Sequence, residues 1–335
     1  MRTYLVTGGL GFIGTNFVKY LFSKRSGLFV INVDCVTYAA NPDNIPENTA
    51  SYKFYKIDIA DKERLSSVFR NHKIDYVVNF AAESHVDRSI MVPSIFIKTN
   101  IEGTLNLLEL SMEHSVKRFL QVSTDEVYGS LGETGKFTEE TPLSPRSPYS
   151  VSKASADMLV LSFFYTFDMP VLITRCSNNY GPYQFPEKLI PLTIINAMTD
   201  KEIPLYGDGK NVRDWIYVTD HVKSILSVLE KGEAGNVYNI GGDSEMENIV
   251  IVTMILKKLN KPVSLIKYIK DRPGHDRRYA MDFTRIKEKL GFNPAVDINQ
   301  GLDQTIKWYI DNEKWWRRII SGEYKEYYKK AYELR

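Results

Sequence analysis

The chain has 335 residues, 43% of them hydrophobic and 25% charged, which suits two domains or one large α/β unit and excludes a wholly disordered chain. The formal net charge of +2 disfavours a dedicated nucleic-acid or membrane-surface protein. The only two cysteines, Cys35 and Cys176, lack metal-ligand spacing and favour a reducing compartment, so we expect no metal. No apolar run approaches the ~18 residues that span a bilayer, and no signal-peptide segment precedes the first strand pattern. We therefore expect a cytoplasmic protein that binds neither membrane nor nucleic acid.

Short β-branched runs alternate with helical patterns through the first half of the chain. This alternation is typical of a doubly wound parallel sheet of the Rossmann type. Most of the strand runs are almost continuously apolar, so both of their faces should be buried. Strands are expected at 4–7, 29–33, 53–57, 76–80, 119–123 and 171–175, and helices at 13–24, 62–71, 101–114 and 150–167.

The alternation ends after residue 175, where a segment rich in Pro, Gly and aromatic residues begins at 178–191. We expect an α/β protein with a smaller, discontinuous C-terminal substrate domain. Residues 1–177 with roughly 211–240 are assigned to the sheet domain, and residues 178–210 and 241–335 to the substrate domain. The last stretch, 315–335, is rich in Trp, Tyr and Lys and is expected to be a capping helix or a tail.

A glycine-rich turn follows the first expected strand. Gly9, Gly11 and Gly14 complete G-x-G-x-x-G between a strand and a helix, the context in which this motif binds a dinucleotide. Glycines allow the backbone to turn tightly and to approach a pyrophosphate that faces the helix N-terminus. Asp34 follows Gly14 by twenty residues, where a carboxylate accepts hydrogen bonds from a ribose diol and repels a 2′-phosphate. We therefore expect NAD rather than NADP.

Asp58 follows the third expected strand, and two interpretations of it stay open. Its carboxylate either reaches the adenine amino group or caps the helix that begins after it.

Tyr149 and Lys153 lie four residues apart at the start of an expected helix and therefore share one face. An ammonium near the phenol would lower the pKa of Tyr149 from about 10 and make it a base near neutral pH. The same lysine could hold ribose hydroxyls. The pair is therefore a candidate for catalysis next to the cofactor.

Polar residues also follow the fourth and fifth expected strands, at the carboxyl edge where doubly wound sheets bind ligands. Thr124, Asp125 and Glu126 end the fifth strand, and two carboxyl groups with separated pKa values could supply one acid and one base. His85 follows the fourth strand and is either a structural histidine or a contact for substrate or diphosphate.

Together these motifs resemble the extended short-chain dehydrogenase/reductase superfamily, and within it the dTDP-glucose 4,6-dehydratases, over nearly the whole chain. Thr124-Asp125-Glu126 is the distinguishing feature. Sugar-nucleotide epimerases of the superfamily lack the acid pair, and its GDP-mannose dehydratases and UDP-glucuronate decarboxylases typically have Ser before Glu. The matching segments are the glycine turn, 81–89, 124–129, 149–153, 178–191, 206–215 and 271–279.

The resemblance implies the reaction from dTDP-glucose to dTDP-4-keto-6-deoxyglucose and water, a step of deoxysugar biosynthesis such as the rhamnose pathway. Hydride would leave C4 for bound NAD, water would be eliminated across C5 and C6, and the hydride would return to C6. The alternatives are a UDP-glucose 4,6-dehydratase, a UDP-sugar 4-epimerase and a non-catalytic NAD-binding protein. The resemblance also implies a homodimer through the helices at 101–114 and 150–167, whose apolar residues occupy more than one face.

Residue roles carried over from the family are also expectations. Thr124 would bind near the sugar 4-hydroxyl, Asp125 would be the general acid, Glu126 the general base, and Tyr149 would start the oxidation beside Lys153. The expected cofactor residues are Gly8, Gly11, Phe12, Ile13, Gly14, Asp34, Thr37, Asp58, Ile59, Ala81, Ala82, Ser84, Thr99, Tyr149, Lys153 and Asn179. The expected substrate residues are Ser84, His85, Thr124, Asn178, Lys188, Leu189, Pro204, Tyr206, Arg213, Asn248, Arg272 and His275.

Overall fold

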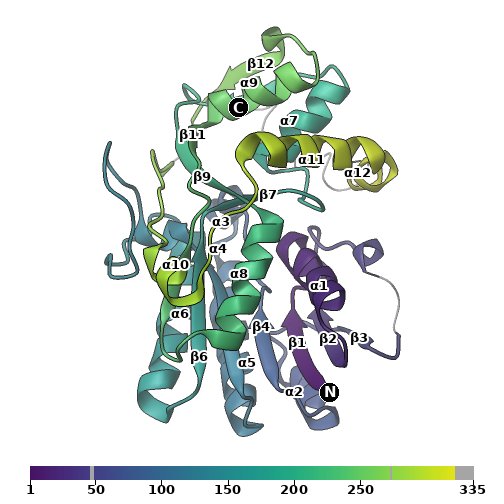
Figure 1. The fold of residues 1–335 in the computed structure, drawn as a ribbon, viewed down its shortest axis with the longest axis vertical. Helices are drawn as coiled ribbons and strands as arrows, with labels where there is room; N and C mark the ends of the chain where they lie inside the picture. The colour runs from purple at the N-terminus through teal and green to yellow at the C-terminus, as the bar shows by residue number, and fades with distance from the viewer. Residues whose placement is uncertain (46–48, 272–273, 321–335) are drawn as a thin grey trace.

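The structure is a computed structural model that describes residues 1–45, 49–271 and 274–320. Its centre is a parallel sheet with the strand order β10-β6-β5-β4-β1-β2-β3 (Figure 1). The part 3-2-1-4-5-6 of this order is that of dinucleotide-binding folds and confirms the expected Rossmann-type architecture. The strands are β1 (Arg2–Thr7), β2 (Leu28–Asp34), β3 (Tyr52–Lys56), β4 (Tyr76–Asn79), β5 (Arg118–Thr124), β6 (Val171–Cys176) and β10 (Val237–Ile240).

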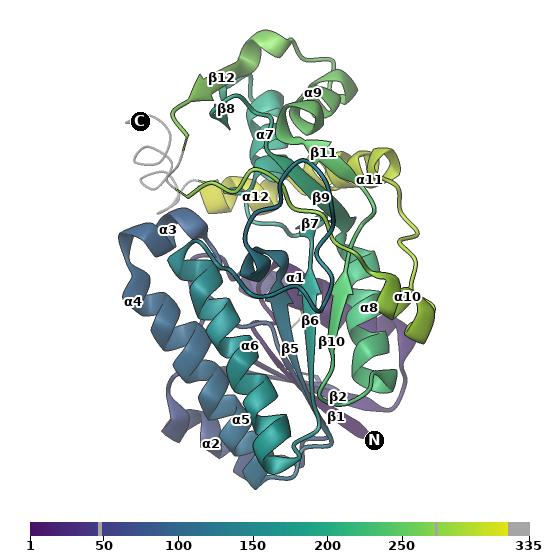
Figure 2. The same ribbon diagram turned by 90° about the vertical axis from the view of Figure 1, so that its left-hand side faces the viewer.

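Helices cover both faces of this sheet (Figures 1 and 2). One apolar core joins the sheet to α1 (Phe12–Lys24), α8 (Val218–Lys231) and α10 (Thr284–Leu290). A second core joins its other face to α2 (Lys62–Asn71), α5 (Gly103–Glu113) and α6 (Pro148–Phe167). The strands contribute side chains to both cores, which explains why their sequences are almost continuously apolar.

The helix expected at 101–114 is only partly regular. Residues 103–113 form α5, but Ile97–Glu102 form the π-helical segment η2, which follows α3 (Val86–Met91) and α4 (Pro93–Phe96). Hydrophobic periodicity does not separate an α-turn from a π-turn, so the sequence pattern misses this change.

A smaller unit lies over the carboxyl ends of the central strands (Figure 1). It contains the three-stranded sheet β11-β9-β7, the pair β12-β8, and helices packed on them. Its elements are β7 (Asn178–Tyr180), α7 (Leu189–Met198), β8 (Ile203–Tyr206), β9 (Val212–Tyr217), β11 (Glu245–Glu247), α9 (Asn248–Lys258), β12 (Ile266–Ile269), α11 (Ile298–Asp311) and α12 (Glu313–Ile320). The short helices η1 (Pro42–Asn44), η3 (Asp125–Tyr128) and η4 (Val263–Leu265) complete the described elements.

The chain crosses between the two units more often than the domain division of the sequence assumes. β9 was assigned to the sheet domain but pairs with β7 and β11. In α10, Ile286 belongs to the apolar core of the central sheet. The domain boundaries themselves stay a prediction.

Residues 315–320 of the expected C-terminal helix or tail belong to α12 (Glu313–Ile320). Trp316 is fully buried, and Trp315 Nε1 donates to Asn44 Oδ1 at 2.7 Å. Residues 321–335 of that stretch lie outside the described residues. Among the helices that are described, none is both long and apolar enough to cross a membrane.

Candidate active site

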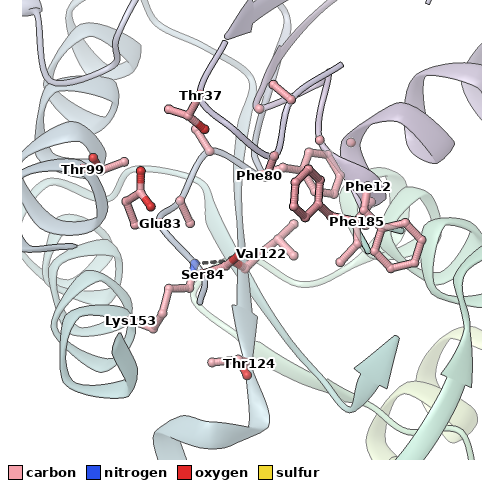
Figure 3. A pocket seen from close by; sticks show the side chains of 18 of the residues that line it. Phe12, Thr37, Phe80, Glu83, Ser84, Thr99, Val122, Thr124, Lys153 and Phe185 are labelled. Atoms are coloured by element: carbon pink, nitrogen blue, oxygen red, sulfur yellow. Dashed lines mark hydrogen bonds between the residues drawn. The ribbon is translucent and has the colours of Figure 1, made fainter. Parts of the chain in front are cut away.

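One cavity opens at the carboxyl edge of the central sheet, beside the loops that lead into the small unit (Figure 3). Its lining includes all five expected catalytic residues and every residue expected to hold the cofactor. The topology therefore brings together residues of β2, β5, α6 and β6, and of the loops that follow β1 and β4, which lie far apart in the sequence.

The glycine turn leaves no room for side chains. Gly8 has φ +67°, and a Cβ there would lie 2.7 Å from the backbone nitrogen of Ala81. A Cβ on Gly14 would lie 2.3 Å from the carbonyl oxygen of Gly8. The N-cap of α1 is Gly11, which has no side chain to cap the first turn, and Phe12 to Gly14 line the cavity. The unsatisfied N–H groups of this helix end suit the pyrophosphate of a dinucleotide.

Asp34 ends β2 and is buried in the cavity wall. Its Oδ2 accepts from the N–H of Leu10 at 3.0 Å, and its Oδ1 accepts from the N–H of Val36 at 2.8 Å. Burial raises the pKa of this carboxyl, and the two backbone bonds oppose that rise. A carboxylate has about four acceptor positions, so these bonds leave capacity for a ribose diol.

Asp58 also lines the cavity, and one of its two interpretations is wrong. The N-cap of α2 is Asp61, whose Oδ1 accepts from Arg64 N at 3.1 Å. Asp58 lies three residues too early to cap the helix and accepts from Ala60 N at 2.9 Å instead. The contact with adenine stays a prediction.

The acid pair lies where β5 ends and η3 begins. Thr124 Oγ1 accepts from the N–H of Glu126 at 3.3 Å and donates to Asp125 Oδ1 at 3.2 Å. Asp125 is only 3% exposed, and its pKa is raised well above the usual range by burial and, next, by the charge of Glu126. This environment favours the protonated form of the carboxyl, which is the form that a general acid needs.

Tyr149 and Lys153 begin α6, whose first turn is closed by a capping box between Ser147 and Ser150. The expectation that the lysine lowers the pKa of Tyr149 is wrong for these positions. Burial, then the charge of Glu126, raises that pKa well above its usual value. Lys153 Nζ donates to Val122 O at 2.7 Å, and burial lowers its own pKa (Figure 3). Desolvation of both groups therefore outweighs their proximity along the helix.

The expected substrate residues divide into two groups. Ser84, Thr124, Asn178 and Lys188 line the cavity, and Lys188 Nζ donates to Ser84 O at 3.4 Å. The second group lies outside the lining, at the start of α7, on β8 and β9, at the start of α9 and after β12. Its members are Leu189, Pro204, Tyr206, Arg213, Asn248 and His275.

Within the second group, Arg213 is the residue most closely coupled to the acids. It is buried, donates to Asp276 O at 2.9 Å, and its charge lowers the pKa of Asp125. His275 Nδ1 lies 2.6 Å from Asp271 Oδ1, while Tyr206 OH donates to Asp87 Oδ2 at 2.8 Å. Arg272 lies outside the described residues.

His85 lies outside the residues that line the cavity. It is 5% exposed, and its Nε2 is 3.8 Å from Glu187 Oε2. Glu187 does line the cavity and also accepts from Tyr38 OH at 3.1 Å. Burial raises the pKa of Glu187 to about 7. In this structure His85 contacts the wall through Glu187, and its role toward substrate stays a prediction.

Several lining residues were not predicted from the sequence. Phe80 and Phe185 gather with the expected Phe12 on one side of the cavity, and Glu83 lies with the expected Thr99 on the other (Figure 3). The missed residues carry no motif of their own, although several fall within or beside the segments 81–89 and 178–191. They are Val33, Cys35, Ala39, Ile57, Phe80, Glu83, Val122, Ser123, Cys176, Ser177, Gln184, Phe185 and Glu187.

Comparisons with known proteins agree with this site. Residues 5–305 match the family model of GDP-mannose 4,6 dehydratase. The dTDP-glucose 4,6-dehydratase of Xanthomonas campestris is 50% identical over 97% of this chain and 98% of its own length, and dTDP-glucose 4,6-dehydratase 1 of Escherichia coli K12 is 44% identical over 99% of each chain.

Solved structures show the same fold. The dTDP-glucose 4,6-dehydratase of Bacillus anthracis in complex with NAD has a TM-score of 0.90 and 48% identity, covering 95% of this chain and 100% of that one. The UDP-glucose 4-epimerase of Thermotoga maritima has a TM-score of 0.88 but 31% identity, over 93% and 100% of the two chains. The chain therefore belongs to the nucleotide-sugar 4,6-dehydratase family that the matching model describes, in the group of the dTDP-glucose 4,6-dehydratases.

Proposed function

We propose that this chain is an NAD-dependent dTDP-glucose 4,6-dehydratase, a hydro-lyase that converts dTDP-glucose to dTDP-4-keto-6-deoxyglucose and water. The observation that carries the proposal is the buried Asp125, whose pKa is raised, beside Glu126 and in the same cavity as Tyr149 and the glycine turn. A 4-epimerase needs the tyrosine and lysine but has no use for an acid pair. The family to which the chain belongs supports the same choice.

The residues present fit NAD. Gly8 and Gly14 allow the close backbone packing of the turn, the N-terminus of α1 that follows lines the cavity and suits the pyrophosphate, and Asp34 has acceptor capacity for the adenosine ribose. Lys153 and Asn179 lie farther along the same cavity. NAD, when bound, supplies a reversible acceptor for the hydride at C4, so that a complete turnover leaves no net oxidation.

The side chains of the chain divide the proton transfers. Tyr149 takes the proton of the 4-hydroxyl, and Thr124 holds that hydroxyl in place. A carbonyl at C4 acidifies the C5 proton, which Glu126 removes. Asp125 donates its proton to the departing 6-hydroxyl, which leaves as water. In the structure Tyr149 is still a phenol, and Lys153 is the cation expected to lower its pKa when substrate fills the site.

Two finer parts of the proposal concern assembly and location. We propose a homodimer in which the helices from α3 to α6 face a second copy. Large apolar side chains are exposed there, on segments that run side by side in Figure 2; they are Ile90, Met91, Val92, Ile95, Ile97, Met112, Val151, Met158, Tyr165 and Phe167. The two cysteines are free thiols, which supports the cytoplasm as the site of action. A monomeric mass at micromolar protein would contradict the dimer.

The direct test is to incubate the protein separately with dTDP-glucose and UDP-glucose and to analyse the products. A 4,6-dehydratase yields a sugar nucleotide that has lost the mass of one water and that develops keto-sugar absorbance. An epimerase leaves the mass unchanged, and a non-catalytic protein leaves the substrate unchanged. Faster turnover of UDP-glucose than of dTDP-glucose would overturn the proposed base preference.

A further inference from the structure

Asp157 lies one helical turn beyond Lys153 on α6 and is completely buried. Its Oδ2 accepts from Ser123 Oγ at 3.0 Å and from Arg175 Nε at 2.9 Å. Arg175 is itself only 3% exposed. One carboxylate oxygen therefore binds a hydroxyl and a guanidinium beneath the cavity floor.

Asp157 and its two partners belong to three neighbouring elements, of which α6 and β5 carry or lead into the reacting groups. Asp157 shares α6 with Tyr149 and Lys153, and Ser123 directly precedes Thr124 on β5. Arg175 is the register partner of Ser123 on the neighbouring strand β6. Asp157 thus fixes the distance between the tyrosine helix and the strand end that leads into the acid pair.

Arg175 is held on its other side as well. Its Nη1 donates to Tyr128 OH at 3.0 Å, and Tyr128 OH donates to Asn239 Oδ1 on β10 at 2.7 Å. The guanidinium also lies 4.9 Å from the centre of the Tyr128 ring. The cation is therefore fixed from two sides, and Asp157 is bound to a rigid partner.

Stability alone gives little reason for this arrangement. Taking two charges out of water costs about as much as their attraction returns, and apolar replacements of such pairs are often neutral or stabilising. Asp157 Oδ1 has no hydrogen-bond partner among the described residues. Lys153 Nζ donates to the neutral carbonyl of Val122, burial lowers the pKa of the amine, and Asp157 is the largest influence that opposes this lowering.

We propose that Asp157 is a positioning residue of the active site, whose carboxylate joins α6 to the end of β5 through Ser123 and Arg175 and places a negative charge one helical turn from Lys153. This inference deepens the proposed function and rests on it. It assigns Asp157 no contact with substrate, because it acts through Lys153 and Ser123.

Other charged and titratable groups near Lys153 come from four sides. Cys176 on β6 acts directly on Lys153, and burial raises the pKa of its thiol to about 12, so it stays neutral near pH 7. Burial raises the pKa of Asp125 well above its usual range, which favours its neutral form. On the helices packed against α6, Asp87 and Glu109 pair with other groups, and Lys98, Glu102 and Glu113 are exposed. The remaining neighbours are Tyr149 on α6, Glu126 on η3, Arg175 on β6 and Arg88 on α3, which lies over the ring of Tyr38.

The first test compares Asp157→Asn with Asp157→Glu, which keeps the charge. C4 oxidation is followed by the absorbance of reduced cofactor in a single turnover across pH. For Asp157→Asn we expect the alkaline limb of the profile to move to lower pH by about one unit, the size of a nearby-charge effect. Asp157→Glu should keep the limb of the unmodified protein. An unmoved limb in Asp157→Asn would overturn the proposal.

A second variant separates positioning from folding. The double change D157N/R175M replaces the buried pair with uncharged side chains, so thermal stability should recover relative to Asp157→Asn alone. The alkaline limb of the pH profile should nevertheless stay at lower pH than in the unmodified protein, because the carboxylate that raises the pKa of Lys153 is still missing. If activity and the alkaline limb return to those of the unmodified protein together with thermal stability, Asp157 has only a structural role. The double variant also decides the question if Asp157→Asn does not fold.

A third readout does not depend on the reaction. The ε-carbon of Lys153, labelled with carbon-13 and assigned with Lys153→Arg, can be titrated by NMR in the NAD-loaded protein. Its titration should move to lower pH in D157N/R175M. Failure of the protein to turn over dTDP-glucose would count against the proposed function and leave this measurement intact, whereas an unchanged titration would count against the role of Asp157 alone.

Discussion

The turn before α1 is shaped by glycines at one end of the cavity, whereas the part of the cavity at η3 and α6 is formed by charged and polar side chains. Gly8 and Gly14 shape the turn because a Cβ would collide with the neighbouring chain. Asp125, Tyr149 and Lys153 shape the second part through burial and mutual charge. A backbone-built site depends on residue size and local geometry, so a short motif predicts it. A site built on charge depends on which groups the fold buries together.

The largest effect should follow loss of the tyrosine hydroxyl. Tyr149→Phe removes the group that accepts the 4-hydroxyl proton, so we expect C4 oxidation to slow by about three orders of magnitude or more. Single-turnover absorbance should show no reduced cofactor, while NAD still binds. Tyr238→Phe is the matched control, because it removes a buried hydroxyl that accepts from Glu233 N and lies outside the cavity lining. Normal oxidation in Tyr149→Phe would remove the residue from the mechanism.

Loss of the acid pair should slow the elimination of water without preventing oxidation at C4. With Asp125→Asn and Glu126→Gln, oxidation at C4 stays feasible but water loss slows by about two to four orders of magnitude. Reduced cofactor should therefore accumulate on the enzyme, and solvent deuterium should enter C5 more slowly. Glu139→Gln removes a half-buried carboxyl outside the cavity and should leave both steps unchanged. Unchanged dehydration in the two acid variants would contradict their assignment.

These two parts of the cavity also explain what the sequence could predict. The helix at 62–71 and the doubly wound parallel sheet follow from periodicity and motif context, because local pattern and burial agree there. The pKa of Tyr149 could not be predicted, because spacing places Lys153 on the same face but does not report how far both groups are desolvated. Glu187 was missed for the same reason: it is buried against residues far away in the sequence, among them Tyr38 and His85.

One added methyl group in the glycine turn should weaken the binding of NAD. For Gly14→Ala we expect NAD binding to weaken by about one to two orders of magnitude, because the Cβ would lie 2.3 Å from Gly8 O and the turn must shift. Gly132→Ala is the control, since a Cβ there meets open space. Calorimetric titration with NAD measures both. Equal affinity in the two variants would show that the turn tolerates the displacement.

Glu187 should make stability depend on pH. Its carboxyl has a pKa of about 7 in the fold against 4.5 ordinarily, so between these values the folded state binds more protons than the unfolded state. Stability therefore falls as pH rises from about 4.5 to 7, by an amount on the order of 2 kcal/mol. Glu187→Gln should remove this part of the decline. Denaturant unfolding at pH 5 and pH 8 measures the free energy of unfolding of both proteins. An equal decline of that free energy between the two pH values in both proteins would contradict the prediction.

The smallest expected effect concerns cofactor choice, where a side chain acts next to the glycine turn. Asp34 accepts from the N–H groups of Leu10 and Val36 and still offers acceptor positions to a ribose diol. A 2′-phosphate at the same place would meet its negative charge, so the unmodified protein should prefer NAD to NADP. Asp34→Ala should weaken the binding of NAD by about tenfold and reduce the difference in affinity between NAD and NADP.

Asp34→Asn is the informative control, because it keeps an acceptor for one of the two backbone N–H groups while removing the charge. If charge sets the preference, both variants should lose it in fluorescence titrations with the two cofactors. Equal affinity of the unmodified protein for NAD and NADP would show that the charge of Asp34 does not select between them and that the backbone of the glycine turn dominates cofactor binding.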